Sequence, residues 1–376
     1  QGRVDLAFDY IDPFVGANWT LEGIYSKTIN DMIVKNYDIK NALDKDGKEI
    51  YLDDITGIAG DHRPMFEATS TTLPYSGIYV LDNVSKGYSY NISLKAEKSF
   101  NFGLDVMASY TYGKSKTINN GSSSVAASNF NYNYIHGNPN EPELANSNFN
   151  IPHQVMISAY QHIKWNKDIK DTYNNVTTIG LIYSGNSGSP YTLYYAGDLN
   201  GDNARNNDLM YIPTKDDISK MIFESNATIE NGVQTGGYTA AQQAENLNAW
   251  IENDSYLRSH RGEYFERNGD NEGWESRLDL HIDHKFGFKW GKEIKYFQIG
   301  FDIINFTNLL NKSWGASLLG QNSYNFYGPI SISNKIKNGI VSEVQYQFLH
   351  DANYDMRSFN DEYSRWRMQL TAKFIF

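Results

Sequence analysis

Apolar and polar residues alternate along several short stretches of this chain, most regularly in the closing segment 364–376. One parity holds the apolar positions Trp366, Met368, Leu370, Ala372, Phe374 and Phe376, and the other holds the polar positions Arg365, Arg367, Gln369, Thr371 and Lys373. Ile375 is the exception. Because successive side chains on a strand point to opposite faces, this segment is predicted to be one strand with an apolar face and a polar, cationic face.

Eight earlier segments repeat this pattern, which gives nine predicted membrane strands. The earlier segments are 4–10, 19–25 with a continuation to about 35, 88–97, 102–112, 155–163, 177–183, 277–285 and 297–303. A further alternating segment, 340–348, is predicted to be one arm of a hairpin outside the membrane. Strands of about ten alternating residues are what a membrane barrel requires.

The connections between these segments alternate between short and long. Short turns are predicted at 12–18, 99–101, 166–175 and 287–295, and polar loops such as 36–86, 114–153 and 184–275 lie at the other junctions. Outer-membrane barrels place short turns on the periplasmic side and long loops outside the cell. The predicted fold class is therefore all-β, a transmembrane antiparallel β-barrel with long extracellular loops.

The whole chain, 1–376, is predicted to be one partial barrel domain. Nine strands leave two open edges, and Gln1 is neither an initiator methionine nor the start of a signal peptide. We therefore expect barrel strands upstream of this segment. The alternative is a soluble all-β adhesin or surface-binding module, in which the apolar faces pack against one another without a membrane.

The composition of the chain argues against several classes of function. The chain has 28 Tyr and 19 Phe among its 376 residues, a net charge of −11 and no Cys. The acidic balance argues against nucleic acid as a partner, and the lack of Cys removes thiolate metal sites and thiol nucleophiles. Without a phosphate-binding glycine loop or a nucleophile-elbow string, no enzyme activity is expected.

The loop at 198–208 carries candidate metal ligands. Asp198, Asn200 and Asp202 are spaced as at the start of a calcium loop, and Asp208 is placed to close the site. An EF-hand would require Gly at position 203 and Glu at position 209, where this chain has Asn and Leu. The alternative is a turn in which Asp and Asn bond their own backbone.

Aromatic residues in the predicted loops are candidates for substrate binding by stacking on a sugar or packing against a peptide. They are Tyr191, Tyr194, Tyr195, Trp250, Tyr324 and Tyr327. Packing within the loops is the alternative for each. Residues 239–256 are predicted to be a capped amphipathic helix, because Thr239 lies three residues before Gln242 and apolar residues follow at helical spacing.

Several strings of this sequence resemble the SusC/Oar-like TonB-dependent outer-membrane transporters, especially the Oar-like branch of the Bacteroidetes. The matching strings lie at 22–31, 86–92, 102–113, 147–153, 197–202 (Gly-Asp-Leu-Asn-Gly-Asp), 206–213, 261–264, 266–268, 301–305 and 365–376. The resemblance implies the carboxyl-terminal strands of a 22-stranded barrel in the cell outer membrane that imports a large nutrient, an oligosaccharide or a peptide. It also implies an amino-terminal plug that couples to the TonB complex, and it allows a SusD-like surface lipoprotein as a partner.

Overall fold

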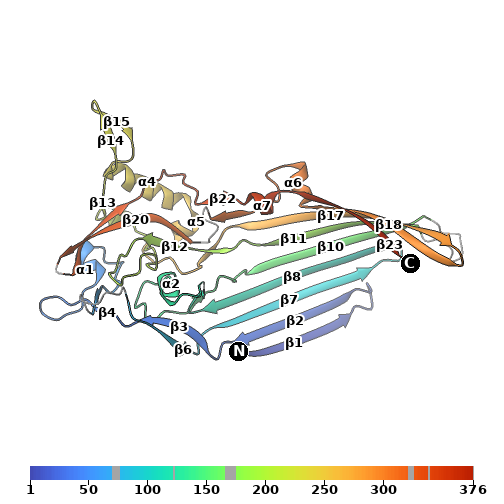
Figure 1. Cartoon of the computed structure of the whole chain (residues 1–376), viewed down its shortest axis with the longest axis horizontal. Helices are drawn as coiled ribbons and strands as arrows, with labels where there is room; N and C mark the ends of the chain where they lie inside the picture. The colour runs from blue at the N-terminus through green and yellow to red at the C-terminus, as the bar shows by residue number, and fades with distance from the viewer. Residues whose placement is uncertain (70–76, 122, 166–174, 321–325, 338, 376) are drawn as a thin grey trace.

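The computed structural model describes residues 1–69, 77–121, 123–165, 175–320, 326–337 and 339–375. It has two parts: a broad sheet of long strands, and a lobe of short strands and helices at one end of that sheet (Figure 1). The sheet contains the predicted membrane strands. The lobe is built from the predicted long loops.

The broad sheet has nine strands along its main path, and every neighbouring pair is antiparallel. This confirms the predicted strands and their order. In spatial order they are β1 (Gly2–Ile11), β2 (Asn18–Lys27), β7 (Tyr88–Ser99), β8 (Leu104–Thr117), β10 (His153–Lys164), β11 (Val176–Ser187), β17 (Trp274–Trp290), β18 (Glu293–Ile304) and β23 (Arg367–Ile375). A short strand, β9 (Ala145–Asn146), extends β8. The described strands form an open sheet with β1 and β23 at its edges.

The register keeps the apolar parity of every strand on the same face. Phe301 of β18 is paired with Ile282 of β17 on one side and with Leu370 of β23 on the other. At the opposite edge, Leu21 of β2 is paired with Phe8 of β1. These side chains are 39–66% exposed, so one sheet face presents a continuous band of apolar side chains that no other described part of the chain covers.

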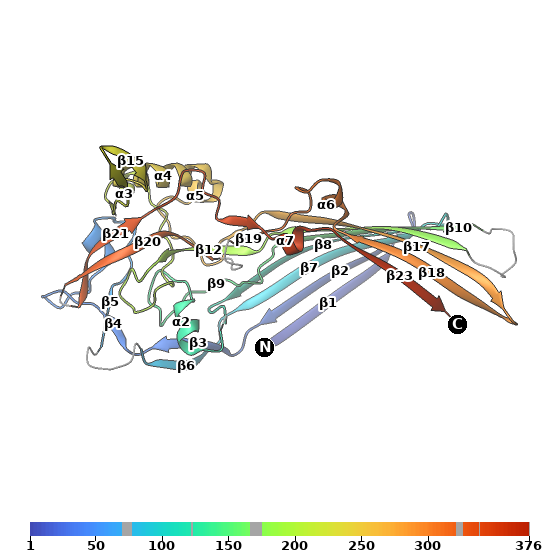
Figure 2. The same ribbon diagram turned by 45° about the horizontal axis from the view of Figure 1, so that its top comes forward.

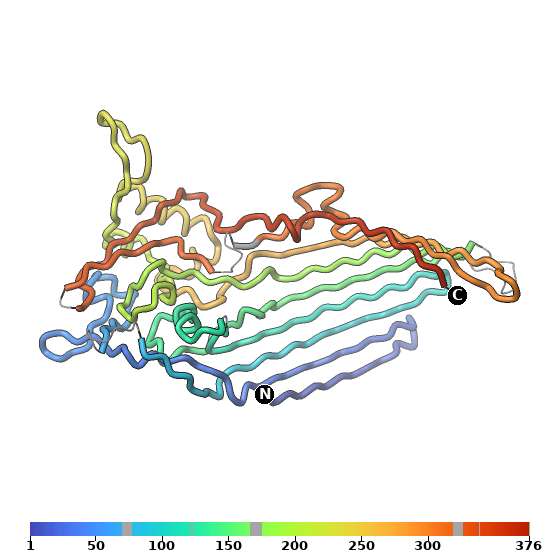
Figure 3. Tube along the Cα trace, viewed as in Figure 1, coloured from blue at the N-terminus to red at the C-terminus, as the bar shows by residue number. Residues whose placement is uncertain are grey.

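The short connections at 12–17, 100–103 and 291–292 lie at the end of the sheet away from the lobe, as the sequence predicts (Figure 3). The fourth predicted turn, 166–175, lies almost wholly outside the described residues. β17 and β18 are joined by a tight turn that contains Gly291 at φ 65°. The predicted continuation of the second strand to residue 35 is wrong, because β2 ends at Lys27 and the chain then enters β3 (Asp31–Asn36), which pairs with β6 (Tyr79–Val84) instead.

The lobe contains a second sheet of five strands, which the sequence did not predict. Its order is β13 (Ile222–Phe223), β21 (Ile340–Gln347), β20 (Phe326–Lys337), β12 (Pro190–Ala196) and β16 (Asp270–Asn271). The β20–β21 pair confirms the predicted hairpin arm outside the nine-stranded sheet. Three smaller pairs complete the strands: β4 (Ile39–Asn41) with β5 (Phe66–Ala68), β14 (Thr228–Glu230) with β15 (Val233–Gly236), and β19 (Leu318–Gly320) with β22 (Arg357–Phe359).

Helices lie beside the second sheet, beside the β3–β6 pair and over the broad sheet (Figure 2). They are α1 (Leu52–Thr56), α2 (Ala126–Asn131), α3 (Lys215–Ile218), α4 (Ala240–Asn253), α5 (Ser255–Ser259), α6 (Phe306–Leu310) and α7 (Asp361–Ser364). No helix within the described residues is long and apolar enough to cross a bilayer.

Helix α4 confirms the predicted capped start, but it ends at Asn253 rather than at 256, and a separate helix, α5, follows. The hydroxyl of Thr239 accepts from the backbone N–H of Gln242, and the side chain of Gln242 accepts from the backbone N–H of Thr239. This reciprocal pair satisfies two of the N–H groups that a helix start leaves unpaired. Leu247, Trp250 and Ile251 then face the core of the lobe.

Most of the fully buried apolar side chains lie in the lobe rather than in the nine-stranded sheet. They include Leu193, Met210, Ile212, Leu247, Phe265, Ile330 and Phe348, each 0% exposed. A barrel wall meets lipid on one face and lumen on the other, whereas the lobe must bury its own apolar surface to remain folded in water. The predicted long loops are therefore an ordered lobe with a hydrophobic core.

Candidate functional site

The acidic loop 198–208 lies inside the lobe, between β12 and α3. Asn200 is 1% exposed, and Asp202, Asn207 and Asp208 are 0% exposed. Gly201 has φ 80°, and a Cβ on it would lie 2.5 Å from the carbonyl oxygen of Phe66. Glycine is needed there for both reasons, because other residues rarely adopt that conformation and any side chain would meet this neighbouring backbone.

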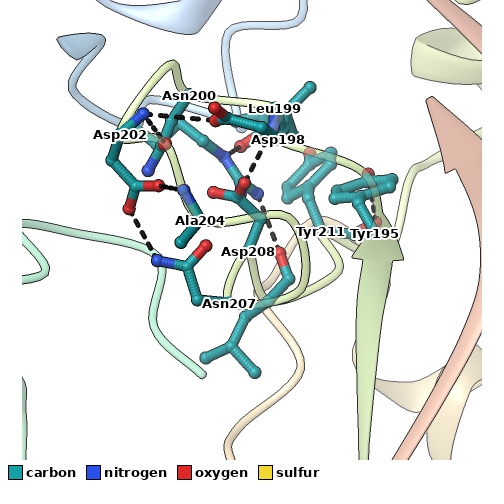
Figure 4. Close-up of polar contacts among 12 residues, drawn as sticks. Tyr195, Asp198, Leu199, Asn200, Asp202, Ala204, Asn207, Asp208 and Tyr211 are labelled. Atoms are coloured by element: carbon teal, nitrogen blue, oxygen red, sulfur yellow. Dashed lines mark hydrogen bonds and ion pairs between the residues drawn. The ribbon is translucent and has the colours of Figure 1, made fainter. Parts of the chain in front are cut away.

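The carboxylates of the loop hold its own backbone (Figure 4). Asp198 accepts hydrogen bonds from the N–H groups of Gly201, Asp202 and Asn203 at 2.8–3.2 Å. Asp202 accepts from the N–H of Ala204 at 2.8 Å and from the Asn207 amide at 2.6 Å. These local bonds are those of an Asx-rich turn, the alternative that the sequence left open.

Asp208 links the loop to Arg63 through an ion pair. One of its carboxylate oxygens accepts from the Leu199 N–H at 2.9 Å, and the other accepts from the guanidinium of Arg63 at 3.2 Å. The same guanidinium donates to Asp61 at 2.8 Å and to the Leu209 carbonyl at 2.9 Å. Arg63 therefore ties the segment before β5 to the acidic loop.

Arg63 is enclosed on its flat faces as well as at its edges. Its side chain is 0% exposed and lies 5.4 Å from the ring centre of Tyr195 and 5.3 Å from that of Tyr264. The two nearby carboxylates outweigh the effect of burial and raise the pKa of this guanidinium above its ordinary value. Sequence reasoning missed Arg63, because it lies in a segment with no periodic pattern.

Burial makes the ionised loop carboxylates unfavourable. It raises the pKa of Asp202 well above its usual range, and the carboxylates of Asp208 and Asp198 raise it further. Burial also raises the pKa of Asp208 to about 7, although the Arg63 guanidinium opposes this shift. A proton or a bound cation would relieve the repulsion among these groups.

The predicted calcium ligands are thus brought together, but their oxygens are engaged with N–H groups. Within the described part of the chain, no group of three or more His, Cys, Asp or Glu side chains is arranged to hold a metal ion. Calcium binding by Asp198, Asn200, Asp202 and Asp208 stays a prediction.

Four of the aromatic residues predicted to bind substrate are buried in the lobe. Tyr191 is 6% exposed, Tyr195 1%, Trp250 4% and Tyr327 8%. Tyr194 is half-buried and lies against Tyr134. The remaining candidate, Tyr324, lies outside the described residues. The structure gives these described rings a packing role, and substrate contact by them stays a prediction.

Three of those rings, Tyr191, Trp250 and Tyr327, also border a cavity of ≈ 600 Å³. The cavity lies between the end of α4, β16 and the segment that precedes β22. Its polar lining includes Glu272 and Arg357, neither of which the sequence singled out. Neither residue lies in a recognisable motif, so no sequence signal identified them.

The polar face of the nine-stranded sheet carries a second cluster. His281 lies 2.6 Å from Asp302 and 2.8 Å from Asp283, while His284 lies on the other face, 2.8 Å from the Thr177 hydroxyl. His281 and His284 therefore lie on opposite faces of β17. The charges form a hydrogen-bonded ladder across neighbouring strands.

Comparison with known protein families identifies the family to which this chain belongs. A family model described as an outer membrane beta barrel domain matches residues 14–349, which is most of the chain. Neither a curated protein nor a solved structure gives a significant match. The match runs from before β2 to beyond β21, so it covers most of the lobe and seven of the nine strands of the broad sheet; β1 and β23 lie outside it. The chain therefore belongs to the outer-membrane β-barrel family and is located in the outer membrane.

Proposed function

We propose that this chain is the carboxyl-terminal part of a SusC/Oar-like TonB-dependent transporter that imports a large nutrient, an oligosaccharide or a peptide. The observation that carries the proposal is the combination of a nine-stranded open sheet with a large folded lobe at only one of its ends. A simple diffusion pore needs a closed barrel wall but no large folded lobe at one end. A lobe with its own core gives the cell-surface end a rigid surface on which a large substrate can be recognised.

The two edge strands support a larger barrel. β1 is paired only with β2, and β23 only with β18, so each leaves a row of backbone N–H and C=O groups without partners in the described sheet. Such groups are costly in lipid, where water cannot satisfy them. Further strands would close the wall, and the resemblance to SusC/Oar-like proteins implies a total of 22.

The polar face of the sheet would then line the lumen. Its ladder of His281, Asp283 and Asp302 offers charged groups to a plug inserted in the barrel. In this proposal an amino-terminal plug fills the lumen and couples to the TonB complex. In the same proposal, a SusD-like lipoprotein is the partner of the lobe at the cell surface.

The test is an uptake assay in living cells. Cells with and without this protein, each in the presence and absence of TonB, are given a panel of labelled oligosaccharides and peptides. We expect at least one labelled compound to accumulate only when both the protein and TonB are present. Uptake that continues without TonB would contradict the proposed energy source, and an absence of protein-dependent uptake across the panel would contradict the proposed import.

We also propose calcium binding at the acidic loop, as a prediction separate from transport. Extracellular calcium sites typically bind at around 10⁻⁴ to 10⁻³ M, so millimolar calcium should slow proteolysis of the 198–208 region and a chelator should restore it. The reason is that a cation would offset the repulsion among Asp198, Asp202 and Asp208. The control is Asp202→Ala, which should abolish the calcium effect. If chelation does nothing to the wild-type protein, the loop is an Asx-rich turn alone.

A further inference from the structure

The cavity beside β16 is an acidic recess with aromatic walls. Its lining includes Tyr191, Trp250 and Tyr327, together with four carboxylates and one guanidinium. Those charged residues are Asp254, Asp270, Glu272, Asp355 and Arg357. When all are ionised, the negative charges exceed the positive ones by three. A volume of ≈ 600 Å³ lies within the range of pockets that hold small organic ligands.

Glu272 is the unusual member of this lining. It is only 4% exposed, and one of its carboxylate oxygens, Oε1, accepts a hydrogen bond from the hydroxyl of Tyr327. The other oxygen, Oε2, is buried and has no hydrogen-bond partner among the described residues. A buried carboxylate oxygen left without a partner costs free energy that a ligand could recover.

The one guanidinium in the lining does not neutralise this carboxylate directly. Arg357 uses its Nε and one terminal nitrogen to bind the carboxylate of Asp355, at 2.8 and 3.2 Å. Its other terminal nitrogen donates to the main-chain oxygen of Glu272 at 3.2 Å, and not to the side chain. The Glu272 carboxylate therefore lacks a bonded counter-charge.

Two further carboxylates each already have a bonded partner within the chain. Asp254 accepts from the Leu257 N–H at the start of α5, and Asp270 accepts from the Tyr191 hydroxyl at 3.0 Å. These partners are neutral, so they leave the negative charge of the recess in place. The recess therefore carries a net negative charge that no bonded cation neutralises.

We propose that this recess binds the protonated amino group of a ligand, with Oε2 of Glu272 as its principal acceptor. A primary ammonium donates in three directions and is attracted to the faces of aromatic rings, which suits carboxylates beside Tyr191 and Trp250. An organic cation suits the site better than a metal ion, because the described residues contain no metal-holding group of three or more acidic or histidine side chains.

For the proposed transporter, this site implies a substrate class: amine-bearing peptides or amino sugars. That step from ligand to substrate rests on the proposed function, whereas the binding of an amine does not. The binding itself requires neither TonB nor a membrane potential. A failed uptake assay would therefore leave the binding site intact, and a failed binding assay would leave transport of uncharged nutrients possible.

Binding is measured by calorimetry on the complete membrane-inserted protein, purified in detergent. The probes are a lysine-containing tripeptide and a glucosamine dimer, each compared with its N-acetylated form, which lacks the charge. We expect at least one amine to bind and its acetylated form to bind about tenfold more weakly or not at all, as for loss of a hydrogen bond to a charged group. Which amine binds more tightly distinguishes a peptide from an amino sugar.

Two variants locate the site. Glu272→Gln keeps the shape and an acceptor for Tyr327 but removes the charge, so amine affinity should fall about tenfold. Glu230→Gln, on the exposed strand β14 away from the recess, is the matched control and should bind as the wild type does. If Glu272→Gln fails to fold, Asp270→Asn provides the same test at the neighbouring carboxylate.

A pH series tests the protonation state of the acceptor. Burial raises the pKa of Glu272 to about 7, while Tyr327 and Arg357 oppose the shift and Asp355 and Asp270 support it. The test uses the lysine-containing tripeptide, because its side-chain ammonium (pKa about 10.4) stays protonated at both pH values. Its binding should therefore be tighter at pH 8 than at pH 5.5, where Glu272 is protonated. Equal binding of amine and acetylated probes, or unchanged amine binding in both the Glu272→Gln and the Asp270→Asn variants, would overturn the proposal.

Discussion

Replacing Arg63 with methionine is expected to destabilise the lobe by about 3–5 kcal/mol, the usual cost of breaking a buried ion pair from one side. The substitution leaves the carboxylates of Asp61 and Asp208, 1% and 0% exposed, without their shared counter-charge. It also removes the hydrogen bond to the Leu209 carbonyl. The measurement is the urea concentration at which a protease begins to cleave the lobe of the detergent-solubilised protein.

Two further variants test whether the loss of stability comes from breaking the buried ion pair. Lys335→Met removes one partner of the exposed Lys335–Glu343 pair on the β20–β21 hairpin and should have little effect, because water screens that pair. Adding Asp208→Asn to Arg63→Met should recover part of the lost stability, since it removes one stranded charge. An Arg63→Met protein as resistant to urea as Lys335→Met would show that the ion pair does not hold the lobe together.

Replacing Leu370 with arginine is expected to cost about 2–4 kcal/mol of folding free energy in a bilayer, the range for a lipid-facing arginine near the midplane. Leu370 lies near the middle of β23, is 65% exposed and is paired with Phe301 of β18. Both side chains belong to the apolar band that the nine strands share. The measurement is urea-induced unfolding of the complete protein from lipid vesicles.

The neighbouring position supplies the control. Gln369→Arg places the same charge on the other face of the same strand, opposite Asp302 of β18, and should be tolerated. Equal effects of the two substitutions would contradict the lipid-facing assignment of the apolar face. A wild-type protein that stays folded and monodisperse without detergent would instead favour a soluble β-array.

The sequence alone was enough to predict the position of Leu370 in the structure, but not that of Arg63. Leu370 could be placed from the sequence, because a period of two is a local property: each side chain's face follows from its position along the strand. The faces also limit the register across the strands, since a shift by one residue would move every apolar side chain to the polar face. A shift by two residues would not, so the exact pairing follows only from the structure. The cap at Thr239 was readable for the same reason, as its partner Gln242 lies three residues away.

Arg63 could not be placed from the sequence. Its partner Asp208 lies 145 positions further along the chain, and neither residue belongs to a periodic segment. The sequence marked Asp208 as a possible metal ligand and the tyrosines as possible substrate contacts, because exposed loops were expected. The structure instead buries Asp208, Tyr195 and Trp250 in a shared core.

What the sequence by itself determined is therefore the membrane-facing sheet: its strands, their two faces and the end that carries the long connections. Only the tertiary structure decided that these connections form a lobe, that Arg63 and Asp208 meet, and that Glu272 borders a recess with one oxygen unpaired. The physical reason is that the alternation is set residue by residue along each strand. Burial, and with it the charge state of a carboxylate, depends on which distant segments pack together.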